Sequence, residues 1–242
     1  MTPVAVFTSV LLLAAPALAQ IDCTQGMAPI DRDAPSSMSA LEFTRAVSAK
    51  EAAFAKAFAG FGYMAEVSVE TLQGDTVDGA FHQTFVVASD GSGARTAKPQ
   101  GPATNTLTRL KLAEKDIDAL VTAPPFALTS DVVAEKDAVY SGRQQVGDHK
   151  ASVFDLLPRN DQAPLHGFIG RVWVWTSRRA VLKSCGRAAS FPIAPMRYEI
   201  VRAQVAGEDW FPLLMRADED VRLGEAPVHI RVNVKYSDYK AR

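Results

Sequence analysis

The amino-acid sequence predicts a mostly β protein with helices (α+β), built on a strongly curved antiparallel sheet, or half-open barrel, with helices on its concave side. Three observations predict this class. Several stretches alternate between apolar and polar residues, which is the period of half-buried strands. Residues typical of turns separate these stretches at short intervals, as in hairpins. Two further stretches suit helices, which would cover one face of the sheet.

The composition is that of an ordinary globular chain. Of the 242 residues, 48% are hydrophobic and 22% are charged, and the formal net charge is −1. Charges of both signs are interspersed along the sequence, which is typical of a solvated surface. No basic region is present that would favour nucleic acid, so we expect no nucleic-acid partner.

Residues 1–19 have the pattern of a secretory signal peptide. The apolar run 4–15 carries no charge and is followed by Pro16 and by the A-x-A cleavage pattern at 17–19. The run lacks the usual preceding Lys or Arg. A membrane anchor is the alternative, but the run is shorter than the roughly 20 residues that span a bilayer. We expect cleavage after Ala19, no transmembrane anchor afterwards, and a periplasmic or secreted protein.

The segment 20–37 is predicted to be a flexible N-terminal tail, because it contains prolines and small polar residues without periodicity. Residues 38–242 are expected to form a single domain. Cys23 follows Asp22 rather than a small residue, which argues against a lipid-anchor cysteine. In an exported chain, Cys23 and Cys185 can form one disulfide, and two unpaired cysteines are the alternative.

Residues 39–59 are predicted to form a helix. Ser39 and Glu42 have the spacing of a capping box, and glycines at 60 and 62 provide the stop. The large apolar residues of this segment fall mostly three, four or seven residues apart and form one stripe on the helix. These residues are Phe43, Val47, Phe54, Phe58 and Phe61.

The remaining segments alternate between strands and loops. Strands are expected around 63–70 and 81–88, a loop over 89–106 with at most a short strand at 94–98, a helix over 107–121 and a second loop through 124–137. Nine or more strands in one sheet should curl, because strands twist. The later strands are expected at about 138–147, 150–157, 167–176, 179–187, 195–206, 209–217 and 228–238.

No catalytic motif is present in the sequence. A nucleophile elbow, a phosphate-binding loop and metal-ligand spacings are all missing, so we expect no enzyme, no cofactor and no metal. Asp116 and Asp118 are expected on a helix surface, and residues 218–220 (DED) in a turn. Arg178 and Arg179 are expected as solvated charges in a hairpin turn. The four histidines are interpreted as surface or hydrogen-bonded residues: His82, His149, His166 and His229.

The strand at 168–176 is expected to present different residues to its two faces, because side chains alternate along a strand. Val172 and Val174 suit close packing and are predicted to meet the inserted helix. Trp173 and Trp175 lie beside Arg171 on the other face. Since Trp suits a partly wet surface, we expect the tryptophans on the convex side, covered by a loop or partly exposed.

Residues 168–187 resemble paired strands of the outer-membrane lipoprotein carrier (LolA-like) superfamily. The resemblance rests on Val172-Trp173-Val174 followed by Val181-Leu182-Lys183, although the turn at 176–179 departs from the family pattern. It implies a half-open antiparallel barrel with helices plugging the concave side. Segments at 125–129, 210–212, 216–218, 228–231 and 234–240 also resemble uncharacterised exported bacterial proteins near that superfamily, so the likeness covers roughly 40–242.

The resemblance implies a non-enzymatic carrier or chaperone for a lipid, an acyl chain or a lipidated protein. The alternative is an envelope sensor or interaction module whose filled barrel binds another protein. The same apolar residues suit either the wall of a cavity or a dry core. The candidate ligand-binding residues, which line the expected cavity, are Phe43, Val47, Phe54, Phe58, Val172 and Val174.

Overall fold

The computed structural model describes residues 21–90, 92–122, 128–133, 136–159, 168–188, 196–207, 209–223 and 226–242. The predicted signal peptide and His166 lie outside these residues. The helices are α1 (Ala40–Ala59), α2 (Glu114–Thr122) and α3 (Ser130–Val133). The strands are β1 (Phe61–Gln73), β2 (Thr76–Ser89), β3 (Arg95–Asn105), β4 (Lys136–Val146), β5 (His149–Pro158), β6 (Phe168–Trp175), β7 (Val181–Ala188), β8 (Tyr198–Ala206), β9 (Asp209–Leu223) and β10 (Ala226–Ala241).

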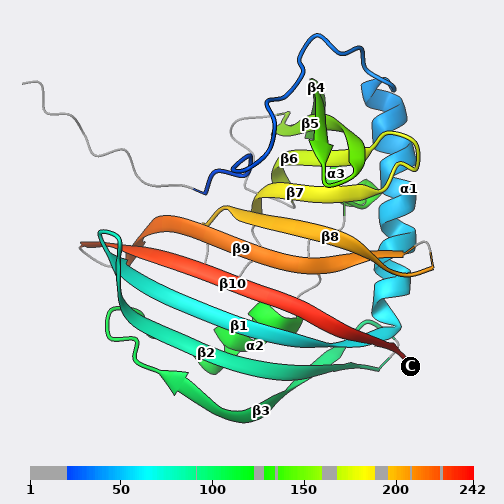
Figure 1. Ribbon diagram of the computed structural model, residues 1–242. Coiled ribbons are helices and arrows are strands. Elements are labelled where there is room, and N and C mark those ends of the chain that lie inside the picture. The colour runs from blue at the N-terminus through cyan, green and yellow to red at the C-terminus, as the bar shows by residue number, and fades with distance from the viewer. Residues whose placement is uncertain are drawn as a thin grey trace, which may run out of the picture.

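The strands of the described residues form one antiparallel sheet in the order β3-β2-β1-β10-β9-β8-β7-β6-β5-β4. Neighbours in the sheet follow each other in sequence except between the third and fourth positions, where β1 pairs with β10. The chain therefore leaves one edge after β3, passes through α2 and α3, and begins again at the opposite edge with β4 (Figure 1). The two edge strands do not pair with each other in the described chain, so the sheet stays open, as predicted.

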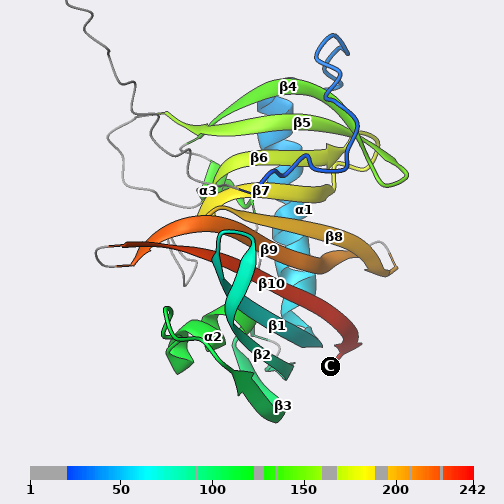
Figure 2. The same cartoon turned by 60° about the vertical axis from the view of Figure 1, so that its left-hand side comes forward.

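The first helix begins and ends where the sequence predicts. The Ser39 side chain accepts a hydrogen bond from the Glu42 N–H, and the Glu42 carboxylate accepts one from the Ser39 N–H. These reciprocal bonds satisfy two donors that a helix terminus otherwise leaves unpaired. The helix crosses the strands on one face of the sheet (Figure 2), which we call the helix face.

Three segments differ from the prediction. The Gly- and Pro-rich segment expected to be mostly loop contains the full edge strand β3, because an edge strand needs partners on one side only. The helix expected from 107 begins at Glu114, where Asp116 accepts a hydrogen bond from the Ala113 N–H. Strand β9 continues to Leu223, so residues 218–220 lie in a strand and not in a turn.

The N-terminal tail packs against the opposite face, which we call the tail face (Figures 1 and 2). Asp31 exchanges two backbone hydrogen bonds, of 2.8 and 2.9 Å, with Arg143 of the edge strand β4. The Gln144 side chain donates to the Ala28 carbonyl, and the Tyr140 hydroxyl donates to the Ala34 carbonyl. The edge of β4 thus supplies hydrogen-bond partners for the tail that the composition of residues 20–37 does not reveal.

A disulfide joins Cys23 of the tail to Cys185 of β7 and resolves the alternative that the sequence left open. Beside it, Gly170 and Gly186 are paired across β6 and β7. A Cβ at Gly170 would collide with the backbone of Cys185, and one at Gly186 with the carbonyl of Ile169 and the ring of Phe168. Glycine at these positions therefore lets the two strands approach closely under the disulfide.

Replacing both cysteines with alanine should lower the free energy of unfolding by about 2–4 kcal/mol, because the bond constrains a long loop of the unfolded chain. The two cysteines are 162 residues apart in sequence. Urea unfolding of the native protein and the double variant measures the loss. Hydrogen exchange at the Asp31 and Arg143 amides should also become faster as the tail is released. Unchanged exchange at both amides would show that the tail is held without the disulfide.

Candidate functional site

The six residues predicted to line a cavity lie together in the core of the helix face. Phe43, Val47, Phe54 and Phe58 of α1 are all buried, and Val172 and Val174 of β6 belong to the same cluster. The aromatic side chains contact each other and the sheet. The Phe43 ring stacks on Phe154 with 4.1 Å between centroids, and the Phe58 ring lies 5.5 Å from both Tyr63 and Phe211. The region beneath α1 is filled by these contacts.

Trp173 and Trp175 lie on the tail face, away from α1, as the alternation predicts. Trp173 is fully buried beneath the tail in a second apolar cluster that includes Ile21, Cys23 and Leu182. Its indole N–H donates a 2.6 Å hydrogen bond to the Gln144 side chain. Trp173 therefore has the covered environment that was one of the two expected outcomes, because the tail seals it and Gln144 accepts a hydrogen bond from its polar atom. Trp175 is partly exposed.

A buried ion pair connects α1 to the sheet. The Glu51 carboxylate accepts hydrogen bonds of 2.7 and 2.9 Å from the two terminal nitrogens of Arg202 in β8. Both side chains are 2% exposed. Glu51 also accepts a 3.1 Å bond from the Leu128 N–H, and the Arg202 guanidinium lies 4.0 Å from the centre of the Phe54 ring. Two-point pairing of this kind fixes the helix relative to the strand.

The sheet parts between the start of β7 and the end of β8, next to this ion pair (Figure 1). The two strands pair only from Lys183 with Val201 to Gly186 with Tyr198. Beyond Val201, β8 continues beside β9 alone within the described residues. A pocket of about 150 Å³ lies at this separation. We call it the split pocket, and its lining residues are Lys50, Glu51, Ala53, Phe54, Arg178, Ala180, Val181, Arg202 and Trp210.

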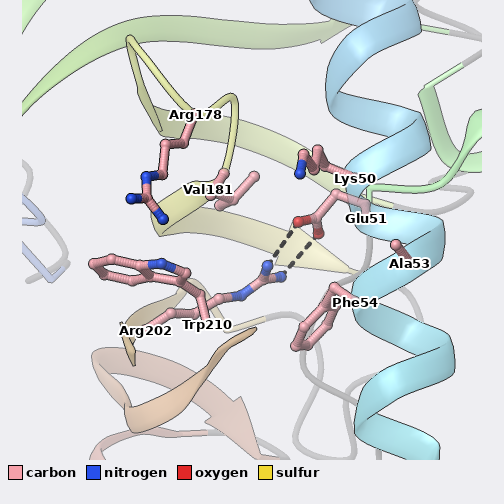
Figure 3. A pocket seen from close by; sticks show the side chains of 9 residues that line it. Lys50, Glu51, Ala53, Phe54, Arg178, Val181, Arg202 and Trp210 are labelled. Atoms are coloured by element: carbon pink, nitrogen blue, oxygen red, sulfur yellow. Dashed lines mark hydrogen bonds and ion pairs between the residues drawn. The ribbon is translucent and has the colours of Figure 1, made fainter. Parts of the chain in front are cut away.

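The side chains of the split pocket come from both sides of the gap. Lys50 and Glu51 extend from α1, while Arg178 and Trp210 lie across from them (Figure 3). Trp210 packs edge-on against Trp175, with 5.5 Å between ring centroids. Its indole nitrogen is buried and has no hydrogen-bond acceptor among the described residues.

A larger hollow lies on the helix face between α2 and the strands β2 and β3. It has a volume of about 620 Å³. Its apolar wall is formed by Phe85, Ala97, Pro99 and Ile117, of which Phe85 and Pro99 are paired across the two strands. Polar and charged side chains complete the lining: Gln83, Glu114, Lys115 and Asp118. We call this space the α2 hollow.

Two of the acidic residues at 218–220 contact a histidine on the neighbouring strand of the sheet. His229 of β10 lies between Asp220, which contacts its Nδ1 at 2.9 Å, and Asp218, which contacts its Nε2 at 2.5 Å. Arg231 donates to Asp218 as well. Both ring nitrogens of His229 are therefore occupied by carboxylates. In the described part of the chain, no group of three or more His, Cys, Asp or Glu residues is arranged to hold a metal ion.

Two perturbed pKa values reflect burial and pairing. Burial raises the pKa of Tyr63 to about 12, and the hydroxyl donates to the Val121 carbonyl at 2.6 Å. Burial would also raise the pKa of Asp155, but hydrogen bonds from Arg171 and Ser141 outweigh it and leave that pKa lowered. These shifts arise from packing and ion pairing.

The polar residues of the split pocket were not predicted from the sequence. Glu51 falls on the apolar stripe of α1, four residues after Val47 and three before Phe54. A charged residue at such a position was a signal for a buried partner. No sequence pattern indicated which residue pairs with Glu51, because Arg202 is 151 residues away in sequence.

No known family profile matches this chain, and no curated protein is similar to it in sequence. Among solved structures, a DUF1329 family protein from Desulfovibrio piger is 10% identical, with a TM-score of 0.43 over 84% of this chain and 94% of that one. An outer membrane lipoprotein-sorting protein domain from Vibrio parahaemolyticus is 11% identical, with a TM-score of 0.39 over 84% and 94%. A LolA superfamily protein from Nitrosomonas europaea is 10% identical, with a TM-score of 0.36 over 85% and 94%.

One of these similar structures is a protein of the superfamily that residues 168–187 resemble. At these identities and TM-scores the likeness assigns neither a ligand nor a partner, so the function rests on this chain's own residues. Among the described residues, no helix is both long enough and apolar enough to cross a membrane.

Proposed function

We propose that this protein is an exported, non-enzymatic carrier that holds an apolar molecule, such as a lipid or the acyl chain of a lipidated protein, on its helix face. We place this face on the inside of the curved sheet. The α2 hollow supports the proposal most directly, because about 620 Å³ lies within the range of small-molecule sites. Four of its eight lining residues are apolar and four are polar or charged, which suits an apolar chain with a polar end.

Two further observations support export. The signal-peptide pattern at 1–19 directs the chain out of the cytoplasm. The disulfide between Cys23 and Cys185 is of the kind that persists in oxidising compartments. The six predicted residues, Phe43, Val47, Phe54 and Phe58 of α1 with Val172 and Val174 of β6, enter the proposal as the walls that a longer chain would contact if it inserted between α1 and the sheet. A shorter ligand would stay in the α2 hollow and leave them packed.

Native mass spectrometry of the protein purified from its own envelope tests the proposal. A carrier should retain a lipid-sized mass, and a fluorescent fatty acid should bind and compete with it. Protein that carries no extra mass and binds no fatty acid would contradict the carrier function.

A substitution that fills the α2 hollow should block binding. Ala97 faces the hollow from β3, so Ala97→Trp should weaken fatty-acid binding by about tenfold or more, because overpacking costs about 1–3 kcal/mol. Thr96→Trp is the matched control, because its side chain is exposed and points to the opposite face of the same strand. Fluorescence titration measures both variants. Equal binding by the two would place the ligand elsewhere.

Protein binding is the second candidate function, and the filled core beneath α1 favours it. Phe43, Phe54 and Phe58 already occupy the space that a hollow interior would leave for a ligand. In that case the protein should be free of lipid in the native mass spectrum. It should also cross-link in the intact envelope to the same protein in independent preparations. Absence of a reproducible cross-link would count against this function.

A further inference from the structure

The N-terminal tail covers a part of the sheet that contains charged as well as apolar side chains. Ile21 of the tail and Trp173 of β6 belong to one buried apolar cluster, against which Met27 packs. Beside this cluster, the Lys183 ammonium lies 2.5 Å from the Glu199 carboxylate, and these side chains are 7% and 2% exposed. The Met27 sulfur contacts the same ammonium at 3.2 Å. Because taking an ion pair out of water costs free energy, this area of the sheet is suited to exposure as well as to cover.

Two pockets lie on the tail face, one on each side of the start of the tail. The first has a volume of about 730 Å³ and is lined by residues of β4, β5, β6 and β7. The second has a volume of about 440 Å³ and is lined chiefly by residues of β9 and β10. Ile21 and Asp22 of the tail line both pockets. Release of the tail would therefore join the two spaces into one groove across the tail face.

The disulfide between Cys23 and Cys185 holds the start of the tail between these two pockets. Both cysteines line the larger pocket and retain small exposed fractions, of 8% and 5%. Gly170 and Gly186 line the same pocket, so the strands present only backbone beside the disulfide. A small dithiol therefore has a route through this pocket to the bond that fixes the tail.

We propose that residues 21–27 form a redox-controlled strap, which a dithiol reductant releases from the tail face by cleaving the disulfide between Cys23 and Cys185. A thiolate of the reductant attacks one cysteine sulfur, and the protein disulfide breaks as a mixed disulfide forms. The second thiol of the reductant then attacks the mixed disulfide. The protein gains two thiols, and the reductant becomes a disulfide. The bond thereby controls access to the apolar cluster around Trp173, and this control does not depend on the carrier proposal.

Acrylamide quenching of tryptophan fluorescence measures the release of the strap. The chain has three tryptophans, so a variant with Trp175→Phe and Trp210→Phe retains Trp173 alone. Trp173 is fully buried, so quenching of the oxidised variant should be weak, and dithiothreitol should increase it severalfold. The far-ultraviolet circular dichroism should not change. Adding Cys23→Ala and Cys185→Ala to the same variant is the matched control, which should be quenched strongly both with and without dithiothreitol.

The rate of reduction distinguishes a strap from a disulfide that opens only in the unfolded chain. Alkylation of the free thiols followed by mass spectrometry measures this rate in dithiothreitol at increasing urea concentrations. A strap should be reduced at a nearly constant rate over the range in which the protein stays folded, because only local opening is needed. A rate that follows the globally unfolded fraction would overturn the proposal. Reduction of the folded protein without any change in Trp173 quenching would overturn it as well.

Discussion

Replacing Arg202 with methionine should lower the free energy of unfolding by about 3–5 kcal/mol, because it leaves the Glu51 carboxylate buried without its counter-charge. Glu51 and Arg202 are each 2% exposed, so solvent cannot replace the lost partner. The Leu128 N–H alone would remain as a donor to Glu51. Urea unfolding at pH 7 measures the loss.

Two further variants separate the cost of an unpaired charge from a general loss of packing. The double replacement Glu51→Leu with Arg202→Met should recover most of the stability, because apolar pairs can substitute for buried ion pairs. A residual cost of about 1 kcal/mol is expected from the Leu128 N–H, which loses its acceptor. Arg231→Met is the control, since Arg231 is 38% exposed and surface pairs contribute about 1 kcal/mol or less. A single Arg202→Met loss no larger than that of Arg231→Met would contradict a buried, energetically coupled pair.

Trp173→Ala should lower the free energy of unfolding by about 3–5 kcal/mol through loss of a large buried side chain. The tail covers Trp173 completely. The substitution would also remove the hydrogen bond that the Gln144 side chain accepts from the indole N–H. Thermal or urea unfolding measures the effect. Binding of a fatty acid in the α2 hollow should be unchanged at temperatures where the variant is folded, because Trp173 lies on the opposite face of the sheet.

Two variants sharpen the interpretation of Trp173. Trp173→Phe retains most of the apolar volume and removes the N–H, so it isolates the hydrogen bond to Gln144. Trp175→Ala should cost less than Trp173→Ala, because Trp175 is only partly buried. Loss of fatty-acid binding by Trp173→Ala without loss of stability would reverse the assignment of the two faces.

The local chemistry of the sequence was sufficient to predict most elements of the sheet and the first helix. The capping box at Ser39 and Glu42 is present, and α1 ends at Ala59 as the glycines indicate. The alternation in residues 63–70 and 168–175 corresponds to β1 and β6. The capping box and the strand alternation depend on residues only a few positions apart, so they can be recognised without knowledge of the tertiary structure.

Segments whose structure depends on distant partners were predicted less well. Strand β3 contains Pro99 and Gly101 and is held by pairing with β2, which supplies hydrogen bonds on one side. Strand β9 continues through Asp218 because His229 and Arg231 on β10 contact that carboxylate across the strands. Cross-strand pairs of this kind are invisible to a short sequence window.

The sequence by itself determined the class of the fold, the two-faced character of the central strand and the apolar stripe of α1, because each depends on local periodicity. Tertiary structure decided the order of the strands, the pairing of β1 with β10 and the sealing of Trp173 by the tail. It also decided two of the spaces between the helices and the sheet. The split pocket exists because β7 and β8 part beside a buried ion pair, and the α2 hollow exists because a short helix covers an edge. Both arise from contacts between segments far apart in the chain, and no local pattern encodes them.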